Sequence, residues 1–292
     1  MVYFIDMDKK LYFTAEKHGM CGGVHAALTL LEQLVASHGQ GVVVFNELVH
    51  NRAVTGDFLR RGVIFADQID AIPENSIVVI GAHGVAPEIE SSLRSRAKEC
   101  FDATCPLVKK LHHIAAGLAP EESLIILGKE GHPEVRGIVG YAGDKPAYII
   151  ASAQEIESLP ELKFPVFISQ TTVDHGEVCI ALEKLRKRYP GLRELSGVCD
   201  ASQKRQEAVL KLVEHVDAVL VVGSAHSSNA RRLREIAEKA GAKSFLIDCA
   251  SDITPEMLKF SGIGITSGAS TPEYLFSEVA EALENNGFIK GN

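Results

Sequence analysis

The sequence predicts an α/β protein built from mainly parallel sheets in three similar lobes. Apolar runs rich in valine and isoleucine alternate along the 292 residues with amphipathic runs of helical spacing. Strands that are apolar without interruption and separated by helices are typical of parallel sheets covered on both faces. In addition, each third of the chain contains a cysteine that lies ahead of a helix-like run. We therefore expect lobes at 21–104, at 105–197, and at 198–292 together with 1–20.

The predicted strands are short apolar runs bounded by turn-forming residues. The first of them contains VVVF at 42–45, which is preceded by Gly41 and followed by Asn46. Runs of this form, ended by Gly, Ser, Asp or Pro, indicate buried strands. In chain order they are 41–47, 76–84, 123–134, 164–172, 217–229, 244–248 and 262–270.

The predicted helices carry apolar residues along one face. In the first of them, Val24, Leu28, Leu31 and Val35 recur at i, i+4, i+7 and i+11. The same spacing follows the second cysteine, where Pro106 suits the first helical position because the N–H that it lacks would have no helical partner there. A third such face lies in 203–216, and further helices are expected at 25–39, 87–99, 176–189, 230–241 and 272–286.

Composition limits the classes of partner. The chain has 30 basic and 38 acidic residues, a formal net charge of −8, which argues against nucleic acid as the main partner. Residues 1–20 carry six charges and no long apolar core, so a signal peptide is not expected. No apolar run approaches the roughly 18 residues of a membrane span, so no membrane partner is expected. We expect a cytoplasmic protein. In that reducing compartment, the six cysteines are expected to be buried, catalytic or metal-bound rather than paired in disulfides.

Polar residues follow five of the predicted strands. Because ligands of open parallel sheets bind beyond the carboxyl ends of the strands, these ends are candidates for a site. Gly and Ser are also ordinary turn residues, but four of the five ends carry polar side chains that can bind an anion, and this favours a shared site. The five stretches are 81–84, 131–134, 170–172, 227–229 and 268–270.

Cys21, Cys105 and Cys199 are candidates for metal ligands. A helix N-terminus favours a thiolate, and three converging thiolates would repel one another without a metal. Their wide spacing differs from that of a zinc ribbon or a ferredoxin and fits a cuboidal iron–sulfur cluster with one ligand from each lobe and one open iron. Three buried structural thiols remain the alternative. We assign Cys179 and Cys249 to packing, and a role for Cys100 stays open.

Short motifs occur in order along almost the whole chain. They are CGGV with Cys21, LVHNRAV with His50, GAHGV with His83, DATCPLV with Cys105, GHPEVRGIVGY with His132 and Glu134, SQTTVD with Thr171, RQEAV after Cys199, VGSAHSSNARRLREIA, and ITSGAS leading into GASTPEYL. Together these motifs resemble the 4-hydroxy-3-methylbut-2-enyl diphosphate reductase family, which supplies the last enzyme of the methylerythritol phosphate route to isoprenoids.

The resemblance implies a cofactor, a set of site residues and a reaction. Its three lobes would surround a central [4Fe-4S] cluster held by Cys21, Cys105 and Cys199, with one iron open. Glu134 would supply protons near the substrate hydroxyl, with Thr171 in the same network. The substrate diphosphate would be bound by His50, His83, His132, Thr171, Ser227, Ser228, Asn229 and Ser270.

The implied reaction is a two-electron reductive dehydroxylation that forms isopentenyl diphosphate and dimethylallyl diphosphate. A ferredoxin or flavodoxin is the expected electron donor, because no G-x-G-x-x-G opens a helix in this chain. Three alternatives stay open. They are a paralogue that reduces another anionic substrate, a cluster-bearing sensor that binds ligand without turnover, and a metal-free α/β protein that binds a sugar or phosphate.

Three positions depart from the pattern of the family. Met20 stands where an aromatic residue is usual before the first cysteine, and His25 stands where an arginine is usual. Asp200 places a carboxylate directly after Cys199. A negative charge there is expected to lower the potential of a cluster.

Overall fold

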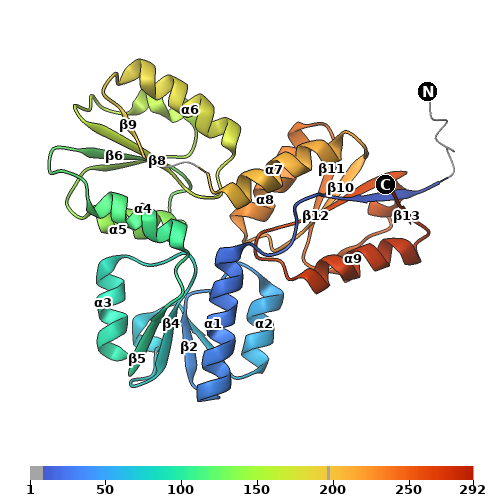
Figure 1. Cartoon of the computed structure of the whole chain (residues 1–292), viewed down its shortest axis with the longest axis horizontal. Helices are drawn as coiled ribbons and strands as arrows, with labels where there is room; N and C mark the ends of the chain where they lie inside the picture. Colours follow the sequence, from blue (N-terminus) through green and yellow to red (C-terminus); the bar gives the residue numbers. More distant parts are fainter. Residues whose placement is uncertain (1–8, 196–197, 292) are drawn as a thin grey trace. The chain divides into compact units, whose positions relative to one another are not determined.

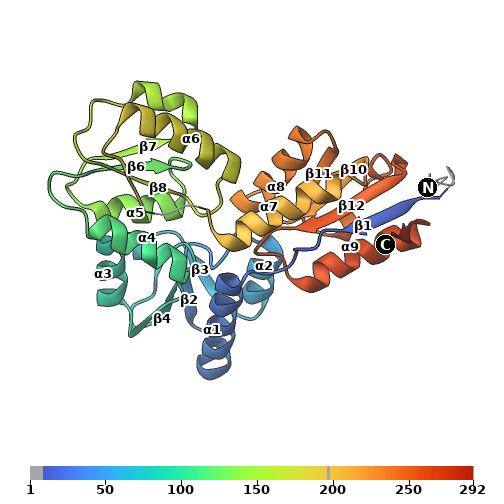
Figure 2. The ribbon, with the colours of Figure 1, turned by 45° about the horizontal axis from the view of Figure 1, so that its top comes forward.

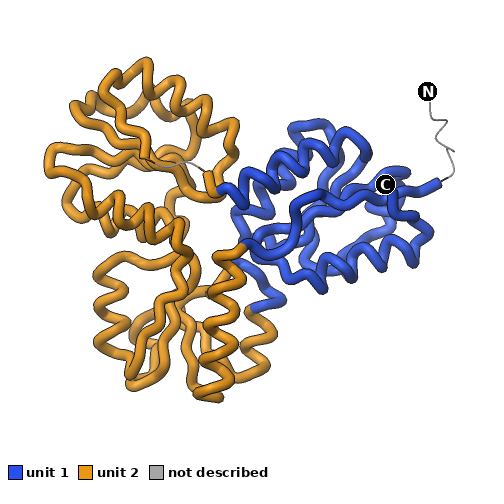
Figure 3. The backbone as a smooth tube through the Cα atoms, in the orientation of Figure 1, with its two compact units in different colours: residues 1–21, 50–54, 200–292 blue, residues 22–49, 55–199 orange. Residues whose placement is uncertain are grey.

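The computed structural model describes residues 9–195 and 198–291, and it confirms the predicted α/β class with three parallel sheets. The parts of the predicted lobes at 1–8, 196–197 and 292 lie outside the described residues. The chain divides into two compact units (Figure 3). Unit 1 comprises 1–21, 50–54 and 200–292, and unit 2 comprises 22–49 and 55–199. The exact borders of the three lobes stay a prediction.

Unit 1 contains one sheet of order β11-β10-β12-β1-β13, in which every neighbouring pair is parallel. Its strands are β1 (Leu11–Thr14), β10 (Ala218–Val222), β11 (Lys243–Ile247), β12 (Gly262–Ser267) and β13 (Ile289–Lys290). Its helices are α7 (Asp200–Val213), α8 (Ser228–Lys239) and α9 (Glu273–Asn285), with short 3₁₀ turns at Ala250–Asp252 and Met257–Lys259. Figure 1 shows α7 and α8 on one side of this sheet and α9 on the other.

Unit 2 contains two sheets of four parallel strands each, in the orders β3-β2-β4-β5 and β7-β6-β8-β9 (Figure 2). The first comprises β2 (Val42–Phe45), β3 (Ile64–Ala66), β4 (Ile77–Ile80) and β5 (Glu99–Asp102). The second comprises β6 (Ser123–Leu127), β7 (Ala147–Ile150), β8 (Pro165–Ser169) and β9 (Arg193–Glu194). The helices are α1 (Gly22–His38), α2 (Arg52–Arg60), which crosses the border with unit 1, α3 (Pro87–Arg96), α4 (Pro106–Ala116), α5 (Pro133–Ala142) and α6 (His175–Arg188), with 3₁₀ turns at Ile69–Ala71 and Ala153–Ser158.

The three sheets repeat one strand order. Numbered by chain order within each sheet, the strands of unit 2 run 2-1-3-4 in both sheets. In unit 1, β11, β10 and β12 follow the same 2-1-3 order, and the N-terminal strand β1 takes the fourth place beside β12. The loose internal repetition expected from the cysteine spacing is therefore present in the topology.

Burial on both faces explains why the central strands are apolar without interruption. In β10, Val219 and Val221 pack with helices α7 and α8, whereas Leu220 and Val222 pack with α9. Successive side chains of a strand point to opposite faces, so a sheet covered on both sides needs an apolar residue at every position. Among the described residues, no helix is long and apolar enough to cross a membrane.

The sequence pattern was wrong at several boundaries and missed the edge strands of the sheets except β11. Glu99 begins β5 rather than ending a helix, and the predicted strand 123–134 ends at Leu127, with α5 beginning at Pro133. The glycines of α5 weaken its helical signal. The pattern did not predict the helices α2 and α5, nor the strands β1, β3, β5, β7, β9 and β13, most of which are short and less buried than the central strands.

Candidate functional site

The strand order places the predicted residues at the ends of neighbouring strands. In an order of 2-1-3-4, the connections leave the first and third strands in opposite directions, and a crevice opens at their carboxyl ends. In unit 2, His83 follows β4, His132 follows β6 and Thr171 follows β8. In unit 1, residues 227–229 follow β10 and Ser270 follows β12. Each of these strands takes the first or third place in the 2-1-3 order that the three sheets share.

Glu134 and Thr171 form a buried pair in unit 2. The Thr171 backbone N–H donates to Oε1 of Glu134 at 2.7 Å, and the Thr171 hydroxyl donates to Oε2 at 2.8 Å. Only 1% of the Glu134 surface is exposed. Burial raises the pKa of this carboxyl to about 7, and the two bonds from Thr171 offset part of that effect. Glu134 therefore exchanges a proton near neutral pH, as a general acid must.

His132 lies beside Glu134 and has a defined tautomer. It caps the N-terminus of α5, where its Nδ1 accepts the backbone N–H of Glu134 at 3.2 Å. Because Nδ1 is an acceptor, the ring carries its proton on Nε2, which makes that nitrogen a donor. The ring of His83 meets the ring of His132 edge-on, with 5.5 Å between centroids. Two strand-end histidines of unit 2 thus lie together.

In unit 1, the loops after β10 and β12 hold each other in place. The Asn229 side-chain oxygen accepts the backbone N–H of Ala269 at 2.9 Å, and the Ser270 hydroxyl donates to the His50 carbonyl oxygen at 3.0 Å. Ser227 caps helix α8 by accepting the backbone N–H of Ala230 at 3.3 Å. These contacts bring the predicted residues of unit 1 to one place.

The environment of Asn229 suits an anion. The side-chain Nδ2 of Asn229 is buried and has no hydrogen-bond partner among the described residues. A buried donor without a partner is costly and commonly marks a group that bonds a ligand or water. Asn229 also lies in the first turn of α8, where backbone N–H groups and the helix dipole favour negative charge. Ser227 and Ser228 add hydroxyl groups at the same helix end.

The three candidate cysteines share one local arrangement. Cys105 is the N-cap of α4, and Cys21 and Cys199 directly precede α1 and α7. Each donates its backbone N–H to a carbonyl in the loop after a third strand. The bonds are Cys21 to Ala269 (3.0 Å), Cys105 to Ala82 (3.0 Å) and Cys199 to Thr171 (3.1 Å). Each acceptor is a predicted anion-binding residue or its neighbour in sequence. Within the described part of the chain all six cysteines are thiols, each of these three is half-buried, and this donor set suits thiolate ligation.

The remaining cysteines differ from one another. The packing assignment of Cys179 was wrong, because its side chain is exposed on α6. Cys249 is partly buried against the core of unit 1, in agreement with its assignment. Cys100 is part of β5 and packs against the hydrophobic core between the first sheet of unit 2 and helix α3. Burial raises the pKa of its thiol. A raised pKa disfavours the thiolate that a metal ligand requires.

Two residues that support the Cys21 loop were not singled out from the sequence. The buried Arg205 of α7 donates to the Gly19 carbonyl and to the Ala201 carbonyl, both at 2.6 Å. Ser267, at the end of β12, accepts the Gly19 N–H at 2.7 Å. Arg205 belongs to the RQEAV motif, which was its only signal in the sequence, since a single arginine in a helix pattern usually predicts a solvated face.

Comparisons with known proteins agree over nearly the full length of the chain. A family model described as LytB protein matches residues 13–284. A 4-hydroxy-3-methylbut-2-enyl diphosphate reductase of Methylococcus capsulatus is 40% identical over 284 residues, covering 94% of this chain and 90% of the relative. The protein of that name from Bordetella pertussis is 38% identical over 282 residues, covering 94% and 86%.

Two solved structures are also similar to this chain. The E-1-hydroxy-2-methyl-but-2-enyl-4-diphosphate reductase from Plasmodium falciparum superposes with a TM-score of 0.90 at 27% identity, covering 97% of this chain and 92% of that one. A structure of (E)-4-hydroxy-3-methyl-but-2-enyl diphosphate reductase, described as the terminal enzyme of the non-mevalonate pathway, superposes with a TM-score of 0.67 at 28% identity, covering 94% and 99%.

Proposed function

We propose that this chain, which belongs to the LytB protein family, reduces 4-hydroxy-3-methylbut-2-enyl diphosphate to isopentenyl diphosphate and dimethylallyl diphosphate. The reaction breaks the bond between carbon and the hydroxyl oxygen. It consumes two electrons and two protons and releases one water. Relatives that carry this name match the chain over 94% of its length, which supports the assignment.

The observation that carries the mechanism is the buried pair of Glu134 and Thr171. A carboxyl whose pKa is raised to about 7 holds a proton near neutral pH and can release it to a leaving hydroxyl. When Glu134 is protonated on Oε2, that oxygen becomes a donor to the Thr171 oxygen, and the threonine hydroxyl can then turn to the substrate. We assign Glu134 as the proton source and Thr171 as the group that relays the proton.

The diphosphate would be held by donors on the loops described above. In unit 1 these are the side-chain amide of Asn229, the hydroxyls of Ser227 and Ser228, and the segment that links Ser270 to His50. In unit 2 they are His83 and His132. Neutral donors and a helix end can bind an anion without a basic protein surface. This agrees with the net charge of −8.

A [4Fe-4S] cluster held by Cys21, Cys105 and Cys199 would supply the electrons one at a time, together with an iron that polarises the C–O bond. The chain's part is to present three cysteine sulfurs, each at or directly before a helix N-terminus. Electrons would come from a ferredoxin or flavodoxin. Thiols and a cluster of this kind need a reducing compartment, so we place the protein in the cytoplasm.

The assignment is tested with protein that is purified and reconstituted with iron and sulfide under anaerobic conditions. A chemical reductant and the diphosphate substrate should give both products. We expect Glu134→Gln to lower kcat by about 10²- to 10⁴-fold, with KM within a few-fold of wild type, since general acids contribute this much. Glu130→Gln, on the exposed part of the same loop, is the matched control. Wild-type protein that binds iron yet forms no product would rule out the proposed activity, and unchanged kcat in the variant would exclude Glu134 as the proton source.

A further inference from the structure

His112 occupies an unusual position in unit 2. It belongs to α4, two turns beyond Cys105, and only 5% of its surface is exposed. One edge of its ring lies against two glycines. A Cβ atom added at Gly84 would lie 2.6 Å from Cε1 of His112, and one added at Gly137 would lie 2.8 Å from its Nε2. Both distances are shorter than real Cβ contacts. The space that Gly84 and Gly137 leave, which we term the glycine notch, therefore fits this ring only because neither residue has a side chain.

The glycine notch joins two segments that carry site residues. Gly84 directly follows His83 and has a φ of +70°, a conformation that glycine adopts without strain. Gly137 is part of α5, whose N-terminus carries His132 and Glu134. A second glycine of α5, Gly140, lies so close to the same loop that an added Cβ would be 2.4 Å from the Cβ of Ala86.

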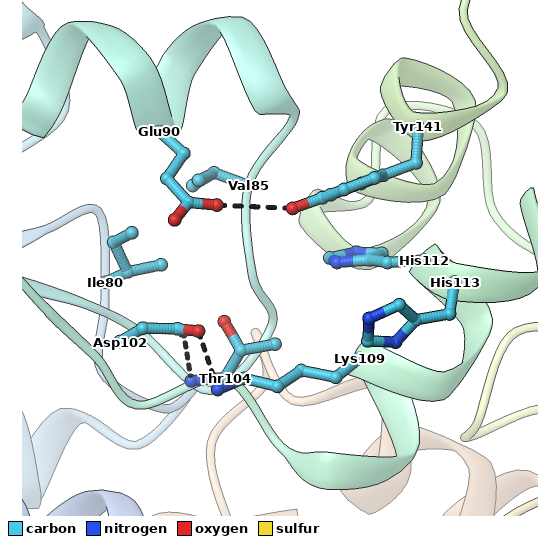
Figure 4. Close-up of a pocket in the computed structure, with 9 residues that line it drawn as sticks. All are labelled: Ile80, Val85, Glu90, Asp102, Thr104, Lys109, His112, His113 and Tyr141. Carbon is cyan, nitrogen blue, oxygen red and sulfur yellow. Dashed lines mark hydrogen bonds and ion pairs between the residues drawn. The ribbon is translucent and has the colours of Figure 1, made fainter. Parts of the chain in front are cut away.

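A face of the His112 ring is also fixed. It stacks on Tyr141 of α5, with 4.3 Å between centroids and 18° between planes. The Tyr141 hydroxyl donates to Glu90 of α3 at 3.2 Å, as Figure 4 shows. The ring is thus held by one face against Tyr141 and by its Cε1–Nε2 edge in the glycine notch, so its size and position set the distance between α5 and the loop that follows β4.

We propose that His112 is a positioning residue whose ring, held in the glycine notch, sets the spacing between His83 on its loop and His132 with Glu134 on α5. This inference rests on the proposed function, in which these side chains bind diphosphate and supply protons. The role is one of shape rather than charge. Burial lowers the pKa of His112 to about 4, against the opposing effect of the Asp102 and Glu90 carboxylates, so the ring is neutral at physiological pH.

The test uses Gly137→Ala, His112→Ala and the double variant in full-length, anaerobically reconstituted protein. Alanine at 137 favours a helix but brings a methyl group against the His112 ring, so α5 and this ring of α4 must move apart. The matched control is Gly56→Ala in α2, where an added Cβ would meet only the end of Arg60 at 3.6 Å. Isothermal titration with inorganic diphosphate measures the affinity of the site without turnover, and KM and kcat are measured separately.

We expect Gly137→Ala to weaken diphosphate binding about tenfold or more and to lower kcat as well, because misplacement of about 1 Å is costly at a reacting centre. His112→Ala should weaken binding too. The double variant should bind better than the sum of the two losses predicts, because the methyl group then enters the space of the missing ring. Gly56→Ala should match wild type in diphosphate affinity, kcat and melting temperature.

Two results would overturn the inference. One is diphosphate affinity in Gly137→Ala and His112→Ala equal to that of wild type. The other is strict additivity of the two losses, which would show that the residues act independently. Failure of the proposed function is distinguishable, because wild-type protein itself would then neither bind inorganic diphosphate nor reduce the substrate. If Gly137→Ala does not fold, the diphosphate affinity of His112→Ala decides the test: a weakened affinity supports the inference, and an affinity equal to that of wild type overturns it.

Discussion

Substitution of Glu134 by glutamine should change how stability depends on pH. Glutamine has the shape of the protonated carboxyl. Its side-chain oxygen can accept the Thr171 N–H that now bonds Oε1 at 2.7 Å, and its amide nitrogen can donate to the Thr171 hydroxyl oxygen. The variant therefore keeps both contacts but has no charge to bury. The difference between the two proteins isolates the cost of ionising a carboxyl in the interior.

The magnitude follows from the pKa of Glu134, which burial raises from 4.5 to about 7. The folded protein then holds this proton more tightly than the unfolded chain. Below pH 4.5 the residue is protonated in both states, and its ionisation costs the fold nothing. As pH rises from 4.5 to 7, the unfolded chain releases this proton while the folded protein still holds it, so stability is lost until the buried group itself ionises near pH 7. A difference of 2.5 between these values, at 1.36 kcal/mol per pH unit, gives roughly 3 kcal/mol once the pH exceeds 7.

Equilibrium unfolding in urea at a series of pH values from 4 to 8 measures this difference. The chain has no tryptophan, so far-UV circular dichroism is the suitable signal. The free energies of unfolding of wild type and Glu134→Gln should agree near pH 4 and diverge as pH rises, with the variant more stable by about 3 kcal/mol at pH 8. The exposed Glu130→Gln should parallel wild type. Curves for Glu134→Gln that parallel wild type over the whole range would refute a buried carboxyl that titrates near 7.

Two further predictions concern the cysteines and the anion site. Cys105→Ser should leave the protein folded but with less iron and sulfide after reconstitution. The control is Cys179→Ser, which replaces an exposed thiol on α6 and should bind as much iron as wild type. Equal iron content in the two variants would contradict the ligand assignment. Asn229→Asp places a carboxylate oxygen where the unpartnered amide nitrogen lies and should weaken inorganic diphosphate binding at least tenfold, because like charges repel in a buried site. Affinity equal to that of wild type would exclude Asn229 as a donor to the anion.

The fold class could be predicted because the central strands are buried on both faces. Runs such as VVVF at 42–45 have no polar residue to suggest any other environment. The edge strands gave weaker signals because each is covered less. Strand β5 is ECFD, with charged residues at both ends, and β9 is an exposed Arg-Glu pair. Their place in the sheets follows from pairing with β4 and β8, which no local pattern encodes.

The sequence predicted the candidate catalytic and anion-binding residues of the site but not the residues that support them. Motifs identified Glu134 and Thr171, and the structure adds what spacing could not provide, namely that the two side chains are bonded and buried together. Arg205 and His112 were not identified as supporting residues, since each acts on backbone or glycine neighbours that are distant in sequence. Helix α5 was not predicted, and its two glycines weaken the helical signal, although the close contacts of Gly137 with His112 and of Gly140 with Ala86 require them.

The backbone bonds of the three cysteines connect each of them to a polar strand end. Each cysteine N–H is held by a carbonyl of a loop that also carries an anion-binding candidate. Cys105 bonds Ala82, beside His83, and Cys199 bonds Thr171 itself. In unit 1, Cys21 bonds Ala269, beside Ser270. A shift of any such loop on binding diphosphate would therefore move the adjacent helix N-terminus and its thiol with it. The arrangement recurs after β12, β4 and β8, the third strand of each 2-1-3 order, and each cysteine is bonded to a strand end that comes from a different third of the sequence.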